Sequence, residues 1–157
     1  MKKLVSMLLC LCLVLSLTAF AAAEGYTAGT YEGKGAGRNG DIVNKEGKRY
    51  VNETERRDVL AAAALKQTDG IFYIICDNKI AKNADVAGME AKGNVVVADT
   101  LEELAEKLGI PADTFVETIE RYNSFVDAQK DDDFGKPLFG EKIDEAPFVA
   151  TPRSPSL

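Results

Sequence analysis

The sequence contains no histidine in any of its 157 positions. That absence excludes Ser-His-Asp and Cys-His catalytic groups, the HExxH zinc site and any haem site with a histidine ligand from the chain. No pattern of the remaining residue types indicates a metal centre, and we expect none.

Cysteine is scarce, and two of the three cysteines, Cys10 and Cys12, lie in the apolar N-terminal segment. If that segment is removed, only Cys76 remains, and the mature chain has no internal disulfide. Cys76 ends the run IFYIIC at 71–76, which has the character of a buried strand. We therefore expect Cys76 to be a small core residue rather than a reactive thiol.

Basic residues are too few to balance the acidic ones, because 19 Lys and Arg face 25 Asp and Glu for a net charge of −6. This balance argues against a nucleic-acid partner, whose phosphates need basic patches, and against anionic membrane surfaces. With 46% hydrophobic and 28% charged residues, the composition is that of one globular domain with a modest core.

Residues 1–23 have the pattern of a secretory signal peptide. Lys2 and Lys3 precede an uncharged apolar run at 4–20, and small alanines follow at the cleavage spacing. The alternative is a membrane anchor, but the run is shorter than the ~20 residues that a spanning helix prefers. We expect an exported protein, periplasmic or extracellular and in some cases associated with the cell surface, with no membrane contact after cleavage.

Residues 24–40 are rich in glycine, which is typical of turns or a linker. The segment GKGAG at 33–37 resembles a phosphate-binding loop, but a dinucleotide fingerprint also needs a preceding strand, a following helix and an acidic residue ~20 positions later. The sequence here continues instead as a hairpin pattern, so we do not expect a dinucleotide site in this segment.

The rest of the chain, 41–157, predicts a mixed α+β domain with short strands and three main helices. A hairpin is expected at 42–52 with Gly47 in its turn, and strands at 71–76 and 94–98. Helices are expected at 57–67, at 100–108 and at 111–129. In the second of these, the Thr100 hydroxyl is expected to cap the N-terminus, and Gly109 is expected to end the helix. Residues 77–93 are expected to be irregular or short-helical, and the tail from Pro137 mostly extended.

Two of these helices are predicted to bury an apolar face. In the first, the expected buried residues are Val59, Leu60, Ala63 and Leu65. In the longest, they recur at helical spacing and include Phe115, Val116, Ile119, Tyr122, Phe125 and Val126. The run at 131–133, DDD, lacks the alternating ligands of a calcium loop, and we expect a solvated helix end there.

Three stretches in this order and spacing resemble one family. They are NKEGKRYVNE at 44–53 followed by Arg57-Asp58, ADTLEELA at 98–105 leading to GIP at 109–111, and TIERYN at 118–123 continuing to DFGK at 133–136. Together they are similar to the capping, or clamp, domain of FAD-dependent fumarate reductases, flavocytochrome c and urocanate reductases. The resemblance covers 41–157.

The resemblance implies an oxidoreductase in which FAD lies in a separate Rossmann-type domain and the cap closes over flavin and substrate. Hydride passes to the double bond of a small unsaturated, fumarate-like carboxylic acid, and an arginine of the cap donates the proton. The position that matches this catalytic arginine is Arg57, with Arg56 as its near neighbour. The alternative is a purely structural role, in which Arg57 lies in the first turn of the helix and pairs with Asp58 or Glu53. No cofactor-binding residue is assigned.

A second, shorter resemblance lies at 26–35, YTAGTYEGKG, which is similar to the opening strand of a small FMN-binding domain. The flavin-attachment motif of that domain is absent, so FMN binding is not carried over from this resemblance, and an FMN-carrying protein stays only among the alternatives. Residues 24–40 are thus either a linker or a remnant of such a domain. Because the cap resemblance follows directly and breaks off at Leu157, the Rossmann FAD domain is expected to be missing and the cap truncated.

We therefore expect a fragment of an exported flavoenzyme, inactive alone unless a separate chain supplies the flavin domain. Two alternatives stay open. One is a stand-alone exported module that binds a ligand or a protein, and the other is a small FMN-carrying electron-transfer protein.

Overall fold

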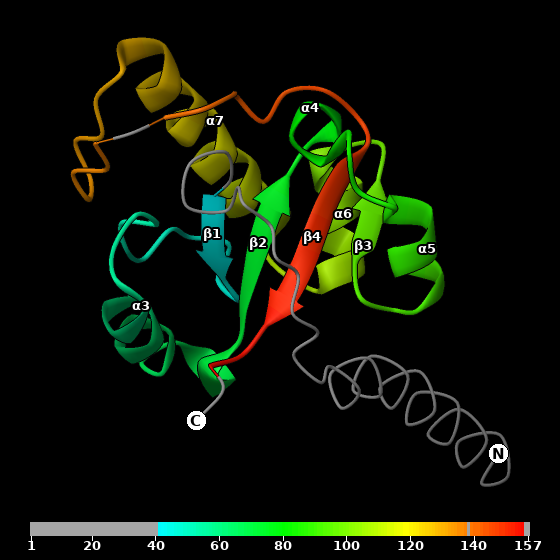
Figure 1. Ribbon diagram of the computed structural model, residues 1–157, viewed down its shortest axis with the longest axis horizontal. Coiled ribbons are helices and arrows are strands. Elements are labelled where there is room, and N and C mark those ends of the chain that lie inside the picture. The colour runs from blue at the N-terminus through cyan, green and yellow to red at the C-terminus, as the bar shows by residue number, and fades with distance from the viewer. Residues whose placement is uncertain (1–40, 138, 156–157) are drawn as a thin grey trace, which may run out of the picture.

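The computed structural model describes residues 41–137 and 139–155. The predicted signal peptide at 1–23 and the glycine-rich segment at 24–40 lie outside the described residues. Within the described part, no helix has both the length and the apolar character needed to cross a bilayer. The chain folds as a four-stranded antiparallel sheet in the order β1-β2-β4-β3, flanked by helices (Figure 1).

The strands are β1 (Asp41–Asn44), β2 (Phe72–Cys76), β3 (Val96–Ala98) and β4 (Phe148–Arg153). The predicted strands at 71–76 and 94–98 are confirmed, the second in shortened form. β4 forms within the tail that was expected to be extended, and it pairs with β2 on one side and β3 on the other. It tolerates Pro152 because β3 pairs only with its first three residues, Phe148 to Ala150, and a proline fits where one side of a strand is open.

The predicted hairpin forms with a shorter second arm than expected. Gly47, at φ +73°, makes the turn, and the backbone of Asn44 pairs with Gly47 and Lys48. Only one bridge, between Val43 and Arg49, continues the pairing, so residues 49–52 are not a strand. Gly47 is also required by packing, because a Cβ there would lie 3.1 Å from the backbone nitrogen of Phe115.

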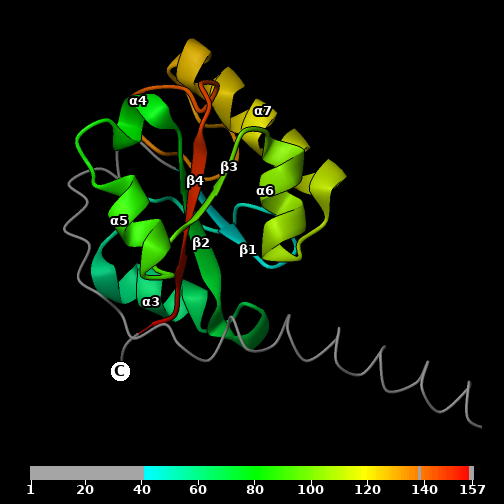
Figure 2. The ribbon, with the colours of Figure 1, turned by 90° about the vertical axis from the view of Figure 1, so that its right-hand side faces the viewer.

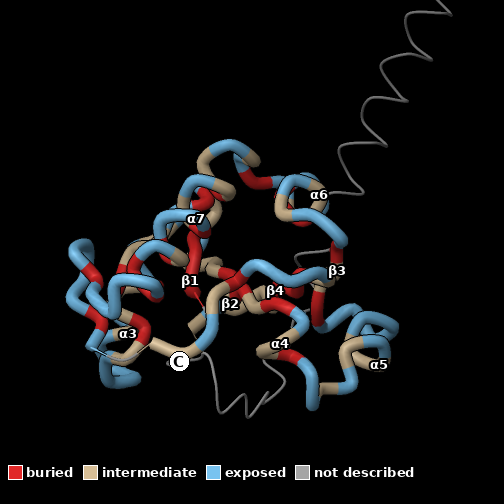
Figure 3. The backbone as a smooth tube through the Cα atoms, turned by 90° about the horizontal axis from the view of Figure 1, so that it is seen from above, coloured by how far each residue is buried: buried red, intermediate tan, exposed pale blue. Residues whose placement is uncertain are grey.

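Helices cover both faces of the sheet, as Figures 2 and 3 show. One face carries α6 (Leu101–Leu108) and α7 (Ala112–Ala128), whose caps agree with the sequence. The hydroxyl of Thr100 accepts the amide of Glu103, and Gly109 ends α6 in the left-handed conformation. The opposite face carries the short helices α4 (Asn78–Ala81) and α5 (Val86–Ala91), in the region expected to be short-helical.

The main core lies between α6, α7 and the sheet. Its buried side chains come from β1, β2, β4 and both helices, and include Val43, Ile75, Leu104, Phe115, Ile119, Tyr122 and Ala150. The predicted buried face of α7 is confirmed at Phe115, Ile119, Tyr122, Phe125 and Val126, while Val116 is half-buried.

A smaller apolar cluster of Ala81, Val95 and Val149 lies under α4 and α5, and the half-buried Cys76 packs against it. Burial and the charge of Asp77 raise the pKa of the Cys76 thiol to about 11, which keeps it protonated and agrees with a packing role.

The prediction for the first helix is wrong in extent and in packing. α3 (Arg57–Ala64) ends three residues early, because the chain turns into a 3₁₀ turn at Thr68–Gly70. Val59 and Leu65, expected to be buried, are 40% and 56% exposed, and only Ala64 is buried. α3 therefore lies at the edge of the molecule (Figure 3), with Val59 exposed, and Leu60 and Ala63, also expected to be buried, only half-buried.

Candidate functional site

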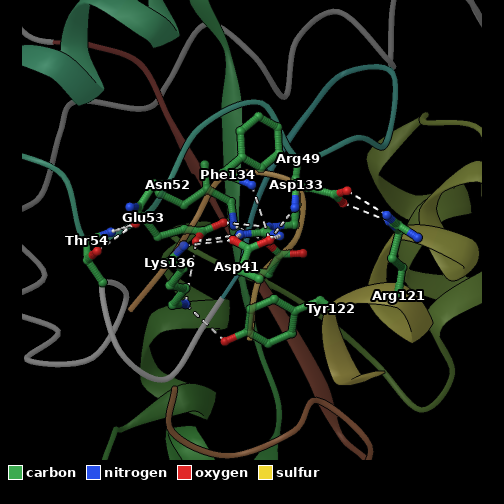
Figure 4. Close-up of polar contacts among 12 residues, drawn as sticks. Asp41, Arg49, Asn52, Glu53, Thr54, Arg121, Tyr122, Asp133, Phe134 and Lys136 are labelled. Atoms are coloured by element: carbon green, nitrogen blue, oxygen red, sulfur yellow. Dashed lines mark hydrogen bonds and ion pairs between the residues drawn. The ribbon is translucent and has the colours of Figure 1, made fainter. Parts of the chain in front are cut away.

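A buried arginine joins three carboxylates from distant parts of the chain (Figure 4). The guanidinium of Arg49 donates to Glu53 from Nε (2.8 Å) and NH2 (2.9 Å), and to Asp131 from NH1 (3.2 Å) and NH2 (2.9 Å). Nε also lies 3.0 Å from Oδ1 of Asp41. The side chain of Arg49 is only 4% exposed and all three carboxylates are 0% exposed, so these bonds are strong and charge-assisted.

The three carboxylates reach Arg49 from separate segments. Asp41 opens β1, Glu53 lies in the loop before α3, and Asp131 follows the C-terminal end of α7. Arg49 faces inward because it pairs with Val43, whose side chain belongs to the core, and cross-strand partners point to the same side of a hairpin.

Aromatic rings and a second buried cation complete the site. The Arg49 guanidinium lies 5.5 Å from the ring centre of Tyr122, 5.8 Å from Phe125 and 5.2 Å from Phe134, within the range of cation–π attraction. Lys136 is fully buried, donates to the Tyr122 hydroxyl at 3.1 Å and lies 3.5 Å from Oε2 of Glu53. We call Asp41, Arg49, Glu53, Asp131 and Lys136 the Arg49 cluster.

Arg49 controls the ionisation of two of these carboxylates. Burial alone would raise the pKa of Asp131, but hydrogen bonds from Arg49 and from the backbone amides of Lys136 and Asp133 lower it to about 2. Burial likewise opposes ionisation of Glu53, yet the hydrogen bonds and charge of Arg49, helped by Lys136, lower the pKa of Glu53. Both side chains are therefore anions in the folded protein at neutral pH.

The other two ionisable members shift in the directions that reduce buried charge. Complete burial, and then the charge of Glu53, raise the pKa of Asp41 well above its usual range. Burial lowers the pKa of Lys136, although Glu53 and Asp41 oppose that change. Within the Arg49 cluster, the shortest pair of hydrogen bonds joins the guanidinium of Arg49 to the carboxylate of Glu53.

The Arg49 cluster leads directly into the segment that carries Arg57. Oδ1 of Asn52 accepts the backbone amide of Thr54 at 2.9 Å and its hydroxyl at 2.6 Å. The amide of Glu55 bonds the carbonyl of Asn52, and the amide of Leu60 bonds that of Arg56 at the start of α3. Hydrogen bonds of these turns therefore hold the short segment between Glu53 and Arg57.

The structure separates the two neighbouring arginines by their contacts. Arg56 forms a bidentate pair with Asp58, with bonds of 3.1 and 2.8 Å, on the surface. Arg57 is exposed as the first residue of α3 and makes no hydrogen bond or ion pair among the described residues. The alternative pairing of Arg57 with Asp58 or Glu53 is therefore not found, because Arg56 and Arg49 occupy those carboxylates.

Sequence reasoning missed the buried roles of Arg49, Asp131 and Lys136. Asp131 was expected in a solvated helix end, but it is buried and bound to Arg49, so that expectation is wrong for Asp131, while Asp132 and Asp133 are exposed. The one available signal was the hairpin register, which places Arg49 beside Val43 on the inner face. In the described ranges, no group of three His, Cys, Asp or Glu side chains is arranged to hold a metal ion.

Comparison with known proteins gives several reductases among the relatives, together with dehydrogenases such as the 3-oxosteroid 1-dehydrogenase of Mycolicibacterium smegmatis. The chain is 46% identical over 122 residues to the NADH:acrylate oxidoreductase of Vibrio harveyi, a match that covers 74% of this chain and 12% of that protein. It is 35% identical over 122 residues to the fumarate reductase (cytochrome) of Shewanella frigidimarina, covering 77% and 21%. It is 32% identical over 123 residues to the urocanate reductase of Eggerthella lenta, covering 73% and 20%. The chain thus spans about a fifth or less of these relatives.

Solved structures agree with the sequence relatives. The open conformation of a flavocytochrome c3 fumarate reductase matches with a TM-score of 0.71 and 31% identity, over 76% of this chain and 21% of that one. A solution NMR structure of a fumarate reductase flavoprotein subunit from Lactobacillus plantarum matches with a TM-score of 0.65 and 27% identity, over 84% of this chain and 94% of that one. Residues 18–155 match the family described as "FAD binding domain". The chain belongs to this FAD binding domain family.

Proposed function

We propose that residues 41–157 act as the capping domain of an FAD-dependent reductase that saturates the double bond of a small unsaturated carboxylic acid. The relatives are named for acrylate, fumarate and urocanate, which share a carbon–carbon double bond conjugated to a carboxylate. The observation that carries the proposal is Arg57, a guanidinium without a partner among the described residues at the first position of α3.

FAD itself does not fit the residues that the structure describes. A dinucleotide site uses a parallel strand, a glycine-rich turn and a helix whose N-terminus faces the pyrophosphate. Every strand pair in the described sheet is antiparallel, and no described glycine-rich turn joins a strand to a helix in this way. The flavin is therefore held outside the described residues, by another part of the enzyme or by another chain.

Arg57 has the chemistry that the reduction needs from a cap. Its positive charge, together with the free amides at the N-terminus of α3, favours a carboxylate nearby and stabilises negative charge that builds on the substrate. A guanidinium is a weak acid in water, so donation of its proton to carbon requires a site from which water is excluded. Closure of the cap over the substrate provides that exclusion.

The domain is of a size that folds without the rest of the enzyme. The chain from Lactobacillus plantarum was solved in solution, and this chain matches 94% of it. That match supports a self-contained cap, with its own core between the sheet and α6 and α7. We therefore expect the isolated chain to fold but to have no reductase activity.

A domain transplant tests the proposal. The segment of the Vibrio harveyi NADH:acrylate oxidoreductase that matches this chain is replaced by the matching residues of this chain, and NADH oxidation is measured with acrylate, fumarate and urocanate. We expect a flavin-loaded chimera that reduces at least one of these acids, and no activity from this chain mixed with FAD and a reduced viologen. A folded, flavin-loaded chimera that reduces none of them contradicts the proposal.

A stand-alone binding module remains the second candidate, since a chain of nearly the same extent folds in solution. The two candidates differ in the surface of α3, where Val59 and Leu65 are exposed. A cap separated from its flavin domain leaves such a surface open, so it binds an apolar dye such as ANS, whereas a self-sufficient module does not. An FMN-carrying protein is the third reading, and a colourless purified chain contradicts it.

We also propose that the protein is exported. This proposal rests on the lysines and apolar run at 1–20, which lie outside the described residues. Mass spectrometry of protein secreted by a bacterial host tests it, with an N-terminus after Ala21 or Ala23 expected. Protein that keeps Met1 and stays in the cytoplasm or membrane contradicts it.

A further inference from the structure

We propose that Glu53, held by Arg49, is a positioning residue that fixes where α3 presents Arg57. This inference rests on the proposed function of Arg57. The contacts of α3 with the rest of the molecule indicate it, because the helix has little other means of holding its first turn in place.

Apolar packing holds α3 weakly. Ala64, near its C-terminal end, is its only buried residue, while Val59 is 40% exposed and Leu60 and Ala63 are half-buried. A helix usually gains most of its stability from a buried apolar face, and an isolated eight-residue helix is unstable in water. The position of α3 must therefore depend on the segments attached to its two ends.

Polar contacts with the hairpin hold the C-terminal end of α3. Nδ2 of Asn44 donates to Oε1 of Gln67 at 3.0 Å, and the hydroxyl of Thr68 donates to Oε1 of Glu46 at 2.5 Å. A surface ion pair between Lys45 and Asp69 adds to these contacts. None of them reaches the first turn of the helix, which carries Arg57.

The N-terminal end of α3 is held by Glu53. Its fully buried carboxylate makes two bonds to Arg49, and Asp131 fixes the other side of the same guanidinium. The Asn52 turn closes the short stretch from Glu53 to the start of the helix. Any movement of Arg57 relative to the core therefore has to strain the pair between Glu53 and Arg49.

Amide hydrogen exchange in the full chain, followed by NMR, tests this positioning role. The variant is Glu53→Gln, and the matched control is Asp77→Asn, because Asp77 is also a fully buried carboxylate that binds backbone amides, those of Ile80, Asp144 and Glu145. We expect Glu53→Gln to speed exchange at Glu55 and Leu60 at least about tenfold more than at amides of β2 and β4. Asp77→Asn should change the exchange rates at Glu55 and Leu60 by the same factor as those of the amides in β2 and β4.

The proposal is overturned if Glu53→Gln changes exchange at Glu55 and Leu60 only in step with β2 and β4, which is the result of a general loss of stability. If Glu53→Gln does not fold, Arg49→Lys serves instead, because it keeps the charge and removes the bidentate geometry. The same local increase in exchange supports the proposal, and a uniform change overturns it.

Kinetics in the transplanted reductase give a second readout. A proton donor displaced by about 1 Å costs on the order of 100-fold in rate, so Glu53→Gln should lower kcat by roughly 10- to 100-fold with KM nearly unchanged. Asp77→Asn should leave kcat close to that of the parent chimera. An unchanged kcat in Glu53→Gln contradicts the positioning role, whereas a parent chimera without activity contradicts the proposed function and leaves the exchange result to decide the positioning.

Discussion

Helices α3 and α7 have similar apolar patterns in sequence but are held in opposite ways. α7 buries Phe115, Ile119 and Tyr122 completely against the sheet and α6. α3 buries only Ala64 and depends on polar contacts beyond its two ends. One helix thus belongs to the core, while the other is a surface element whose position, in our proposal, is set by the Arg49 cluster.

This division agrees with the proposed capping domain, in which the first turn of α3 presents Arg57. A helix that is packed on all sides cannot offer its first residue to a substrate, whereas α3 keeps Arg57 exposed next to a rigid anchor. The exposed apolar side chains of Val59 in α3 and Leu65 just beyond it then lie on the surface where the proposal expects the substrate and the flavin domain.

The largest expected effect on stability comes from a substitution in the buried face of α7. Phe115→Ala removes a completely buried ring from α7 and should lower the free energy of unfolding by about 3–5 kcal/mol. Leu65→Ala, beyond the end of α3, removes a side chain that is 56% exposed and should change it by about 0.5 kcal/mol or less. Urea unfolding followed by circular dichroism measures both. Equal losses would show that the chain at the C-terminal end of α3 is packed as firmly as α7.

The next effect compares the buried Arg49 cluster with the surface ion pair of Arg56 and Asp58. Arg49→Met removes the buried cation that binds the carboxylates of both Glu53 and Asp131 and should cost about 3–5 kcal/mol in unfolding free energy. Arg56→Met removes a pair with Asp58 whose side chains are 81% and 64% exposed, and should cost less than about 1 kcal/mol. A small loss in Arg49→Met would mean that the cluster does not contribute to stability.

The same contrast explains what the sequence could predict. The apolar run of β2, the caps of α6 at Thr100 and Gly109, and the apolar face of α7 are patterns of residues close together in the sequence, and each was predicted. β4 was expected only as extended chain, because its strand character comes from pairing with β2 and β3, and Pro152 disfavours a strand in isolation.

The Arg49 cluster could not be predicted from local patterns. Charged residues are mostly exposed, so Arg49, Asp131 and Lys136 each have the pattern of a surface residue, and only the fold brings them together across 82 positions between Arg49 and Asp131. The reverse error occurred in α3, where Val59 and Leu65 have the pattern of core residues but face outward. The position of Arg57 came from the resemblance to reductase caps, and its role stays a prediction.

A smaller effect tests whether the hairpin turn at Gly47 packs against α7. Gly47→Ala places a Cβ 3.1 Å from the backbone of Phe115 at φ +73° and should cost about 2–4 kcal/mol, from left-handed strain together with overpacking. Gly109→Ala has a similar φ of +68° but open space around it, so it should lose only the strain, about 1–2 kcal/mol. Equal losses in urea unfolding would show that the hairpin turn does not pack on α7.

The smallest effect concerns acid stability. The folded pKa of Asp131, about 2, lies below its usual value of 3.8, so its ionised form stabilises the fold above pH 4. As the pH falls from about 4 to 2, the unfolded chain takes up this proton first and that stability is lost. The stability gap between the parent chain and Asp131→Asn should therefore narrow by on the order of 1–2 kcal/mol between pH 4.5 and 2. A gap that stays constant contradicts this pairing.

The most direct measurement of the central claim compares two neighbouring arginines in the transplanted reductase. Removal of a general acid typically costs 10²- to 10⁴-fold in rate, so Arg57→Gln should lower kcat for the unsaturated acid by about that factor. Arg56→Gln, which removes only the surface pair with Asp58, should keep nearly full activity. If Arg57→Gln turns over as fast as its parent, or if Arg56→Gln is the inactive variant, Arg57 is not the proton donor.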